Sequence, residues 1–148
     1  MKNVFYRLLI VQTLLLCFSG GFSQSHKLDS VKIEFEGFDT ETVFDVTCDA
    51  FNNTFIGTKK NKVVHQERNL IEFESLRKNF EPAKDRSFDV RGKITFRYGA
   101  KAVQYCFDTF GYFYKAGKLY HNKKLLIAIA DNLYSNHPKY LDTLRYHE

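Results

Sequence analysis

The sequence predicts an α+β domain: an antiparallel sheet of about five strands, arranged as hairpins, with two helices packed on one face of the sheet. Three observations predict this fold. Apolar and polar residues alternate over several short segments, turn residues separate these segments, and two longer segments carry apolar residues at spacings of three and four.

The first 24 residues have the pattern of a secretory signal peptide. Two basic residues precede an apolar run at residues 8–18, and small and polar residues follow it. The run has about 11 residues, whereas a membrane-spanning helix needs roughly 20, so no transmembrane segment is expected once the leader is removed. Residues 25–148 then form a single small α+β domain with a polar, partly ordered C-terminal tail, and the domain is periplasmic or secreted.

Cys17 lies at the end of the apolar run, which is also where the lipidated cysteine of a bacterial lipoprotein lies. Such sites need a small residue directly before the cysteine, and Leu16 stands there. A lipid anchor at Cys17 is therefore not expected, and a lipid-tethered envelope protein stays the alternative.

The first part of the domain contains a predicted hairpin. Apolar residues alternate with charged ones over residues 31–36, which is typical of a half-buried strand. Turn residues follow at 39–42, and the apolar face continues in a second strand at Phe44, Val46 and Cys48.

The next part contains the first predicted helix. Residues 49–55 indicate a short helical turn, and polar and basic residues at 56–68 indicate a mobile connection with one short extended piece. A helix is predicted from Asn69, as its N-cap, to about Asn79, and Pro82 ends it. Apolar residues at helical spacing define its buried side: Leu70, Phe73, Leu76 and Phe80.

Residues 88–98 show the most complete alternation in the sequence and predict an antiparallel strand with one face on the core. Gly92 shares the apolar face and indicates a bulge or a close backbone approach. The other members of this face are Phe88, Val90, Ile94, Phe96 and Tyr98. The opposite face is expected to meet solvent, and three of its residues are a second candidate contact surface unless they are ordinary solvated charges: Arg91, Lys93 and Arg97.

The C-terminal half predicts two further hairpin strands and a helix. A turn at residues 99–101 leads into a strand at 103–107. Residues 112–120 predict a hairpin, because Gly117 supplies the positive φ that a short turn needs. The helix that follows is capped by Asn122, and its buried side contains Leu125, Leu126, Ile129 and Leu133.

Cys48 and Cys106 are the cysteines that remain after removal of the leader, and they are the expected disulfide because exported proteins meet an oxidising compartment. The strand pattern places Cys48 on an apolar face, whereas Cys106 shares its face with Gln104. A bulge would reconcile these positions, and two separately buried thiols are the alternative.

The charge of the chain does not indicate nucleic acid as a partner. The formal net charge of +5 falls to +3 without the two basic residues of the leader, and the remaining excess is spread too evenly. The basic cluster at residues 59–62 is interpreted as a solvated surface run.

No catalytic residue, cofactor site or metal site is predicted. The sequence has no G-x-S-x-G elbow and no glycine-rich phosphate loop, and no histidine stands three or four residues from another histidine or a cysteine. Cys106, Asp108 and His121 would converge across the last hairpin, but a thiol in an exported protein is more often bridged or buried.

The aromatic residues between positions 105 and 120 have two interpretations. In the first, the core is filled by Tyr105, Phe107, Phe110, Phe113 and Leu119, and the remaining tyrosines line an edge. In the second, this edge binds another protein, because tyrosine offers a large contact area at a low entropic cost. The candidate interaction edge contains Tyr112, Tyr114, Lys115, Lys118 and Tyr120.

Together these patterns favour a small exported, non-enzymatic domain that binds another protein, as an inhibitor, an immunity-type protein or an envelope accessory protein. The alternative is a small secreted hydrolase or a small-ligand-binding protein. That alternative uses Asp108 and His121, with neighbouring tyrosines, in a concave pocket.

Overall fold

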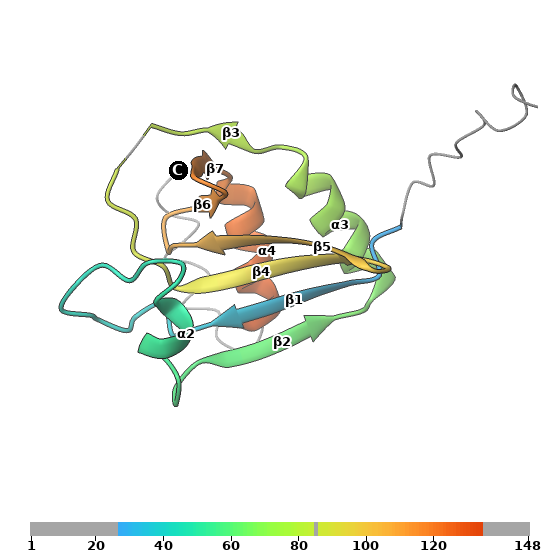
Figure 1. The fold of residues 1–148 in the computed structure, drawn as a ribbon. Helices are drawn as coiled ribbons and strands as arrows, with labels where there is room; N and C mark the ends of the chain where they lie inside the picture. Colours follow the sequence, from blue (N-terminus) through green and yellow to red (C-terminus); the bar gives the residue numbers. More distant parts are fainter. Residues whose placement is uncertain (1–26, 85, 135–148) are drawn as a thin grey trace, which may run out of the picture.

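The computed structural model describes residues 27–84 and 86–134 (Figure 1). The expected signal peptide at residues 1–24, including Cys17, and the polar tail after residue 134 lie outside this part of the chain. The described part is an α+β fold with an antiparallel sheet, as predicted, but the sheet has seven strands rather than about five. Every helix in the described ranges is too short or too polar to span a bilayer.

The elements follow the chain in the order β1 (Ser30–Phe35), α2 (Phe51–Thr54), β2 (Lys60–Val64), α3 (Glu67–Arg77), β3 (Glu81–Pro82), β4 (Gly92–Tyr98), β5 (Lys101–Phe107), β6 (Tyr112–Lys115), β7 (Lys118–His121) and α4 (Lys123–Leu133). Their order across the sheet is β2-β1-β4-β5-β6-β7-β3. In Figure 1, α4 lies behind the long central strands and α2 lies in front of them. The sheet therefore has one face covered by long helices and one face covered only at the end where α2 packs.

The predicted hairpin between residues 31–36 and 44–48 is wrong. β1 lies between β2 and β4 instead, with Ile33 opposite Lys62 on one side and opposite Ile94 on the other. Residues 36–50 leave the sheet as a long loop, and the segment expected to be a mobile connection supplies the edge strand β2. Alternation identifies a strand by its buried face, but it does not identify the strand's partner.

The main core lies between the sheet and the two longer helices. Fully buried side chains come from every layer, among them Ile33, Phe73, Phe96, Phe107, Leu125 and Ile129. α3 begins after Gln66, three residues before the predicted cap, and Asn69 instead donates a hydrogen bond from Nδ2 to Oδ1 of Asn132 in α4 (3.1 Å).

Asn122 caps α4 as predicted and also joins the two helices. Its Oδ1 accepts the N–H of Leu125 at 2.9 Å, which satisfies one of the open donors in the first helical turn. Its Nδ2 donates to the carbonyl oxygen of Leu76 at the end of α3 (2.8 Å). One buried side chain therefore fixes both the start of α4 and its position against α3.

A second apolar cluster lies on the opposite face of the sheet, under α2. It contains Val46, Phe51, Phe55, Val90 and Cys106. The strand predicted at residues 88–98 begins only at Gly92, and Val90 packs into this second cluster rather than into the main core. The chain therefore changes faces just before β4, and the predicted single apolar face does not extend to Phe88 and Val90.

Gly92 stands where neighbouring atoms leave no room for a side chain, which agrees with the close backbone approach that the sequence pattern predicted. A Cβ atom at this position would lie 2.2 Å from Cζ of Phe107 and 2.7 Å from the carbonyl oxygen of Glu34. The backbone N–H of the preceding Arg91 donates to the carbonyl of Phe107 (2.8 Å), so the hydrogen bonds between this segment and β5 continue up to the start of β4.

We expect Gly92→Ala to lower the free energy of unfolding by about 1–3 kcal/mol, because the added methyl group overlaps a buried ring and a backbone oxygen. Gly57→Ala is the matched control, since no atom lies within 4 Å of its Cβ position. The control should change stability by no more than about 0.5 kcal/mol. Urea unfolding of the mature chain measures both, and equal midpoints for the two variants would contradict the close approach.

Candidate functional site

The residues of the predicted interaction edge do not form one surface. Tyr114 lies on the α2 side of the sheet, where its ring is 6.0 Å from that of Phe88. Tyr120 lies on the helix side, 5.6 Å from the ring of Phe80. The hairpin is also not a free edge, because β3 pairs with β7 and covers it. Lys115 and Lys118 stand opposite each other at the far turn of the hairpin, away from Tyr112 at its other end.

The predicted core residues of the hairpin are buried, with one exception. Tyr105, Phe107, Phe113 and Leu119 are buried as expected. Phe110 is 65% exposed, so its assignment to the core is wrong. It lies in the turn between β5 and β6, which projects from the end of the sheet.

Arg91, Lys93 and Arg97 do not form an exposed row on β4. Arg97 is exposed, whereas Arg91 and Lys93 are buried beneath the loop that carries α2. The ammonium nitrogen of Lys93 lies 5.6 Å from the centroid of the Phe51 ring. The sequence pattern missed this burial because the covering residues come from a segment about 40 positions away, which propensity and periodicity do not place.

Asp108 has a structural role in the turn between β5 and β6. Its Oδ1 accepts the backbone N–H groups of Phe110 (2.8 Å) and Tyr112 (2.9 Å), which closes the turn. Burial raises the pKa of this carboxyl above its ordinary range. His121 stacks on Tyr112, with the ring centroids 4.8 Å apart. Neither Asp108 nor His121 lines the clefts that flank the loop 37–50 and the helix α3.

Metal ligands do not gather in the part of the chain that the structure describes, where no group of three His, Cys, Asp or Glu side chains is placed to hold a metal ion.

A cleft that the sequence did not predict lies between the loop 37–50 and the turn after β5. Its volume is about 480 Å³, and it opens to solvent at the end of the sheet. Its lining residues come from the loop, from the segment before β4 and from the turn: Phe38, Asp39, Thr40, Glu41, Thr42, Asp89, Arg91, Thr109 and Phe110.

The floor of the cleft is an ion pair that also fixes the loop. The guanidinium of Arg91 binds both carboxylate oxygens of Asp89, at 2.8 and 2.5 Å, and donates to Oγ1 of Thr42 at 2.9 Å. Asp89 accepts the backbone N–H of Val46 as well (2.8 Å). Two-pronged contacts of this kind are directional and strong, so the chain is held at both Thr42 and Val46.

Glu36 holds the loop where it leaves β1. Its buried carboxylate accepts the N–H of Gly37 (3.0 Å) and the hydroxyl of Thr58, which lies beyond α2. One side chain thereby connects the two ends of the segment between β1 and β2, at Gly37 and Thr58.

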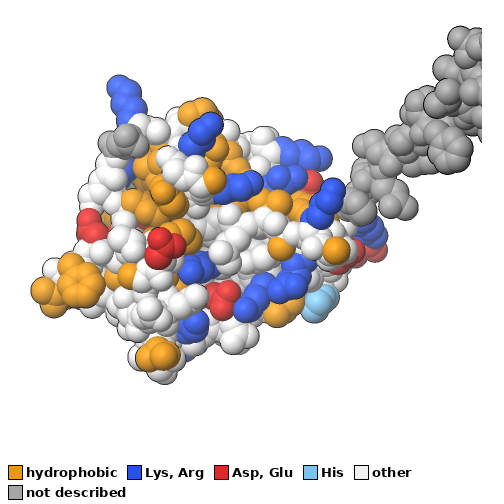
Figure 2. Space-filling view, in the orientation of Figure 1, with side chains coloured by type: hydrophobic (Ala, Val, Ile, Leu, Met, Phe, Trp, Pro, Cys, Tyr) orange, Lys and Arg blue, Asp and Glu red, His pale blue; other side chains and the backbone are white. Residues whose placement is uncertain are grey.

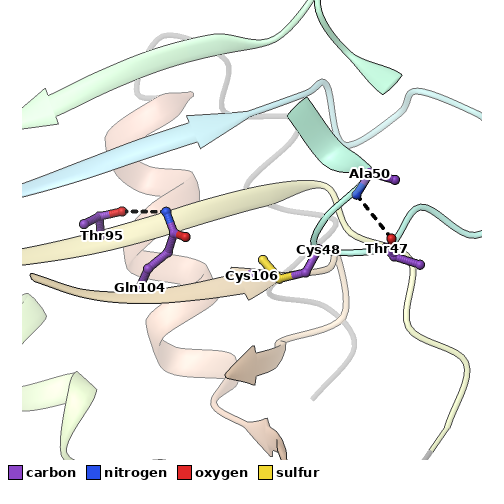
Figure 3. Close-up of a disulfide and its surroundings, with 6 residues drawn as sticks. All are labelled: Thr47, Cys48, Ala50, Thr95, Gln104 and Cys106. Carbon is purple, nitrogen blue, oxygen red and sulfur yellow. Dashed lines mark hydrogen bonds between the residues drawn. A yellow bond between two sulfur atoms is a disulfide. The ribbon is translucent and has the colours of Figure 1, made fainter. Parts of the chain in front are cut away.

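The disulfide between Cys48 and Cys106 attaches the loop to the sheet, as the sequence predicted (Figure 3). Cys106 faces the α2 side of β5, and the Cα atoms of the two cysteines are 5.8 Å apart. No bulge is needed, because Cys48 lies in the loop that covers this face rather than in a strand. Beside the bridge, Oγ1 of Thr47 accepts the N–H of Ala50 (3.2 Å) and supports the start of α2.

Large apolar side chains project from the same end of the molecule. Val43 is fully exposed and Phe44 is 67% exposed. Residues 38–42, which directly precede them, line the cleft together with Phe110. Figure 2 shows orange side chains at the left end of the molecule, where Figure 1 draws this loop. We call Val43, Phe44, Phe110 and the adjacent cleft, which Phe110 and the residues before Val43 line, the tip surface.

Comparison with protein-family models, with curated proteins and with solved structures finds no significant match to this chain. The geometry and chemistry of the tip surface are therefore the basis for inferring a function.

The disulfide is expected to carry a large part of the domain's stability. A bridge with a sequence separation of 58 residues stabilises by about 4 kcal/mol through loop-closure entropy. We expect the Cys48→Ala/Cys106→Ala variant to lose stability of this order in urea unfolding. Reductant should destabilise the wild-type protein similarly and leave the double variant unchanged. A wild-type midpoint that does not respond to reductant would contradict this prediction.

Substitutions of Asp108 separate a turn-forming role from a charged one. Asp108→Ala leaves two backbone N–H groups without their acceptor and should lower the free energy of unfolding by about 2–3 kcal/mol. Asp108→Asn keeps an acceptor oxygen and should be at least as stable as the wild type at pH 7.

The pH dependence provides the second half of this test. Because the pKa of Asp108 is raised in the folded protein, its carboxyl binds a proton more tightly when folded, above the ordinary pKa of 3.8. Its contribution to stability therefore falls as pH rises through the interval between 3.8 and the raised value. The advantage of Asp108→Asn should grow over that interval. If both substitutions lowered the free energy of unfolding equally at every pH, the turn-forming role of Asp108 would be wrong.

Proposed function

We propose that this chain is an exported, non-enzymatic domain that binds another protein through the tip surface. The observation that carries the proposal is the combination of exposed apolar side chains and a fixed backbone. Single exposed apolar residues are common in proteins, but several at one end of the fold, beside a cleft, are typical of an interaction site. Val43, Phe44 and Phe110 have this arrangement.

The fixed backbone favours binding because little freedom is lost when a partner docks. Ordering a flexible loop opposes association, and a loop that is ordered beforehand avoids this penalty. Here the disulfide, the Arg91–Asp89 pair and the Glu36 carboxylate hold the loop from three directions. An inhibitor, an immunity-type protein or an envelope accessory protein would use such a preformed surface.

One tyrosine of the predicted edge adjoins the tip surface. The guanidinium of Arg86 lies 4.3 Å from the ring centroid of Tyr112 and 5.9 Å from that of Phe110. Arg and Tyr are enriched where protein partners bind tightly. We therefore extend the proposed contact area to Arg86 and Tyr112 and leave Tyr120, Lys115 and Lys118 outside it.

Export to the periplasm or the medium is part of the proposal. Two features support it: the secretory pattern of the first 24 residues, and a disulfide, which persists in oxidising compartments. The partner would then be another protein of the envelope or the surroundings.

Serine substitutions at the tip surface should weaken partner capture without affecting the fold. Phe44→Ser and Phe110→Ser are expected to reduce the amount of partner captured from the native envelope by tagged mature protein at least about tenfold, as loss of an interface anchor does. Ile71→Ser on α3 is the matched control, because Ile71 is as exposed as Phe110, at 65%. Quantitative mass spectrometry measures the capture. The proposal fails if all three variants capture the same proteins in the same amounts.

A further inference from the structure

The segment that builds the tip surface has an unusual charge. Residues 33–58 contain six acidic residues and no lysine or arginine, although the chain as a whole has a net charge of +5. The acidic residues are Glu34, Glu36, Asp39, Glu41, Asp45 and Asp49. Such a concentration of one sign in a chain of the opposite sign gives this end of the molecule its own electrostatic field.

Two of the six carboxylates, those of Glu34 and Glu36, are not exposed. Glu34 pairs with Lys32 at 3.0 Å, and the buried Glu36 accepts hydrogen bonds from the loop. The other four are exposed. Asp45 accepts the hydroxyl of Ser87, but none of the four pairs with a lysine or arginine of the described residues. An exposed carboxylate without a local cation remains available to a charged partner.

The unpaired carboxylates surround the apolar residues of the tip surface. Asp39 and Glu41 line the cleft, and Val43 and Phe44 stand between Glu41 and Asp45 in the loop. Arg91 does not balance them, because its charge is already matched by the two-pronged contact with Asp89. The loop side of the tip surface is therefore an apolar projection with an acidic rim, whereas a cation, Arg86, lies on the Phe110 side.

A metal ion is not the counter-charge for this rim. The acidic side chains of the described residues do not converge in any group of three that would hold one. Carboxylates that are spread around an apolar centre match a surface of similar width, and a protein provides such a surface.

We infer that the partner of the tip surface is a cationic protein whose apolar pocket is rimmed by lysine and arginine side chains. This inference rests on the proposed function and adds the chemistry of the partner. Opposite charges around an apolar contact raise the association rate and exclude partners with an acidic surface. Val43 and Phe44 occupy the pocket, while Asp39, Glu41 and Asp45 face the basic rim.

The test begins with a photo-crosslinking residue, benzoylphenylalanine, in place of Val43 in the oxidised mature protein. Irradiation in native envelope extract, followed by mass spectrometry, identifies the protein in contact with this position. We expect one cationic protein, cross-linked at a peptide that adjoins lysine or arginine residues.

Binding of that purified protein is then measured with two variants of equal charge change. Asp39→Asn/Glu41→Gln should slow association about tenfold at low salt and much less in about 0.5 M salt, where charges are screened. The control, Glu72→Gln/Glu81→Gln, removes two exposed carboxylates from α3 and β3 and should change the rate less than about twofold.

The outcomes separate this inference from the proposed function. If a cross-linked partner binds both double variants equally well, the cationic partner is wrong and the binding site stands. Cross-linking to a second copy of this chain also overturns the inference, because the partner is then this chain. If position 43 cross-links to no protein, the proposed function fails and the inference fails with it.

Discussion

The attachment of one loop to the open face of the sheet is the constraint on which the functional end of this molecule depends. Residues 36–59 connect two neighbouring strands without adding a strand of their own, and connections of this length are uncommon unless they have a function. The Cys48–Cys106 bridge fixes the middle of the loop, and the Arg91–Asp89 pair fixes the part before it. The second apolar cluster lies beneath the same loop, and the covalent and ionic contacts complete its attachment.

The C-terminal half of the fold follows from local sequence signals. The turn of the last hairpin places Ala116 and Gly117 at positive φ, and the next residue with a capping side chain, Asn122, starts the helix. These elements depend on neighbours within a few positions, so turn chemistry and periodicity predict them. The close approach at Gly92 was also predictable, because a glycine in a regular strand has a steric cause.

The N-terminal half and the tip surface depend on contacts between distant segments, which the sequence pattern did not resolve. Lys93 looked solvated because its strand alternates, yet a loop from elsewhere in the chain covers it. Phe44 and Phe110 were counted with the apolar faces, although both are exposed on connections between elements. The absence of lysine and arginine between positions 33 and 58 was a signal in the sequence that pointed to this end of the molecule.

Amide hydrogen exchange at Val46 and Val90, in the oxidised protein and in a variant that lacks the bridge, tests most directly whether the loop is held in place before a partner binds. The Val46 amide donates to Asp89, and the Val90 amide donates to the carbonyl of Val46, so both report attachment of the loop. We predict protection at both amides in the oxidised protein, and loss of it without the bridge while the β4 amides stay protected. Fast exchange at Val46 and Val90 in the oxidised protein would contradict a preformed tip surface.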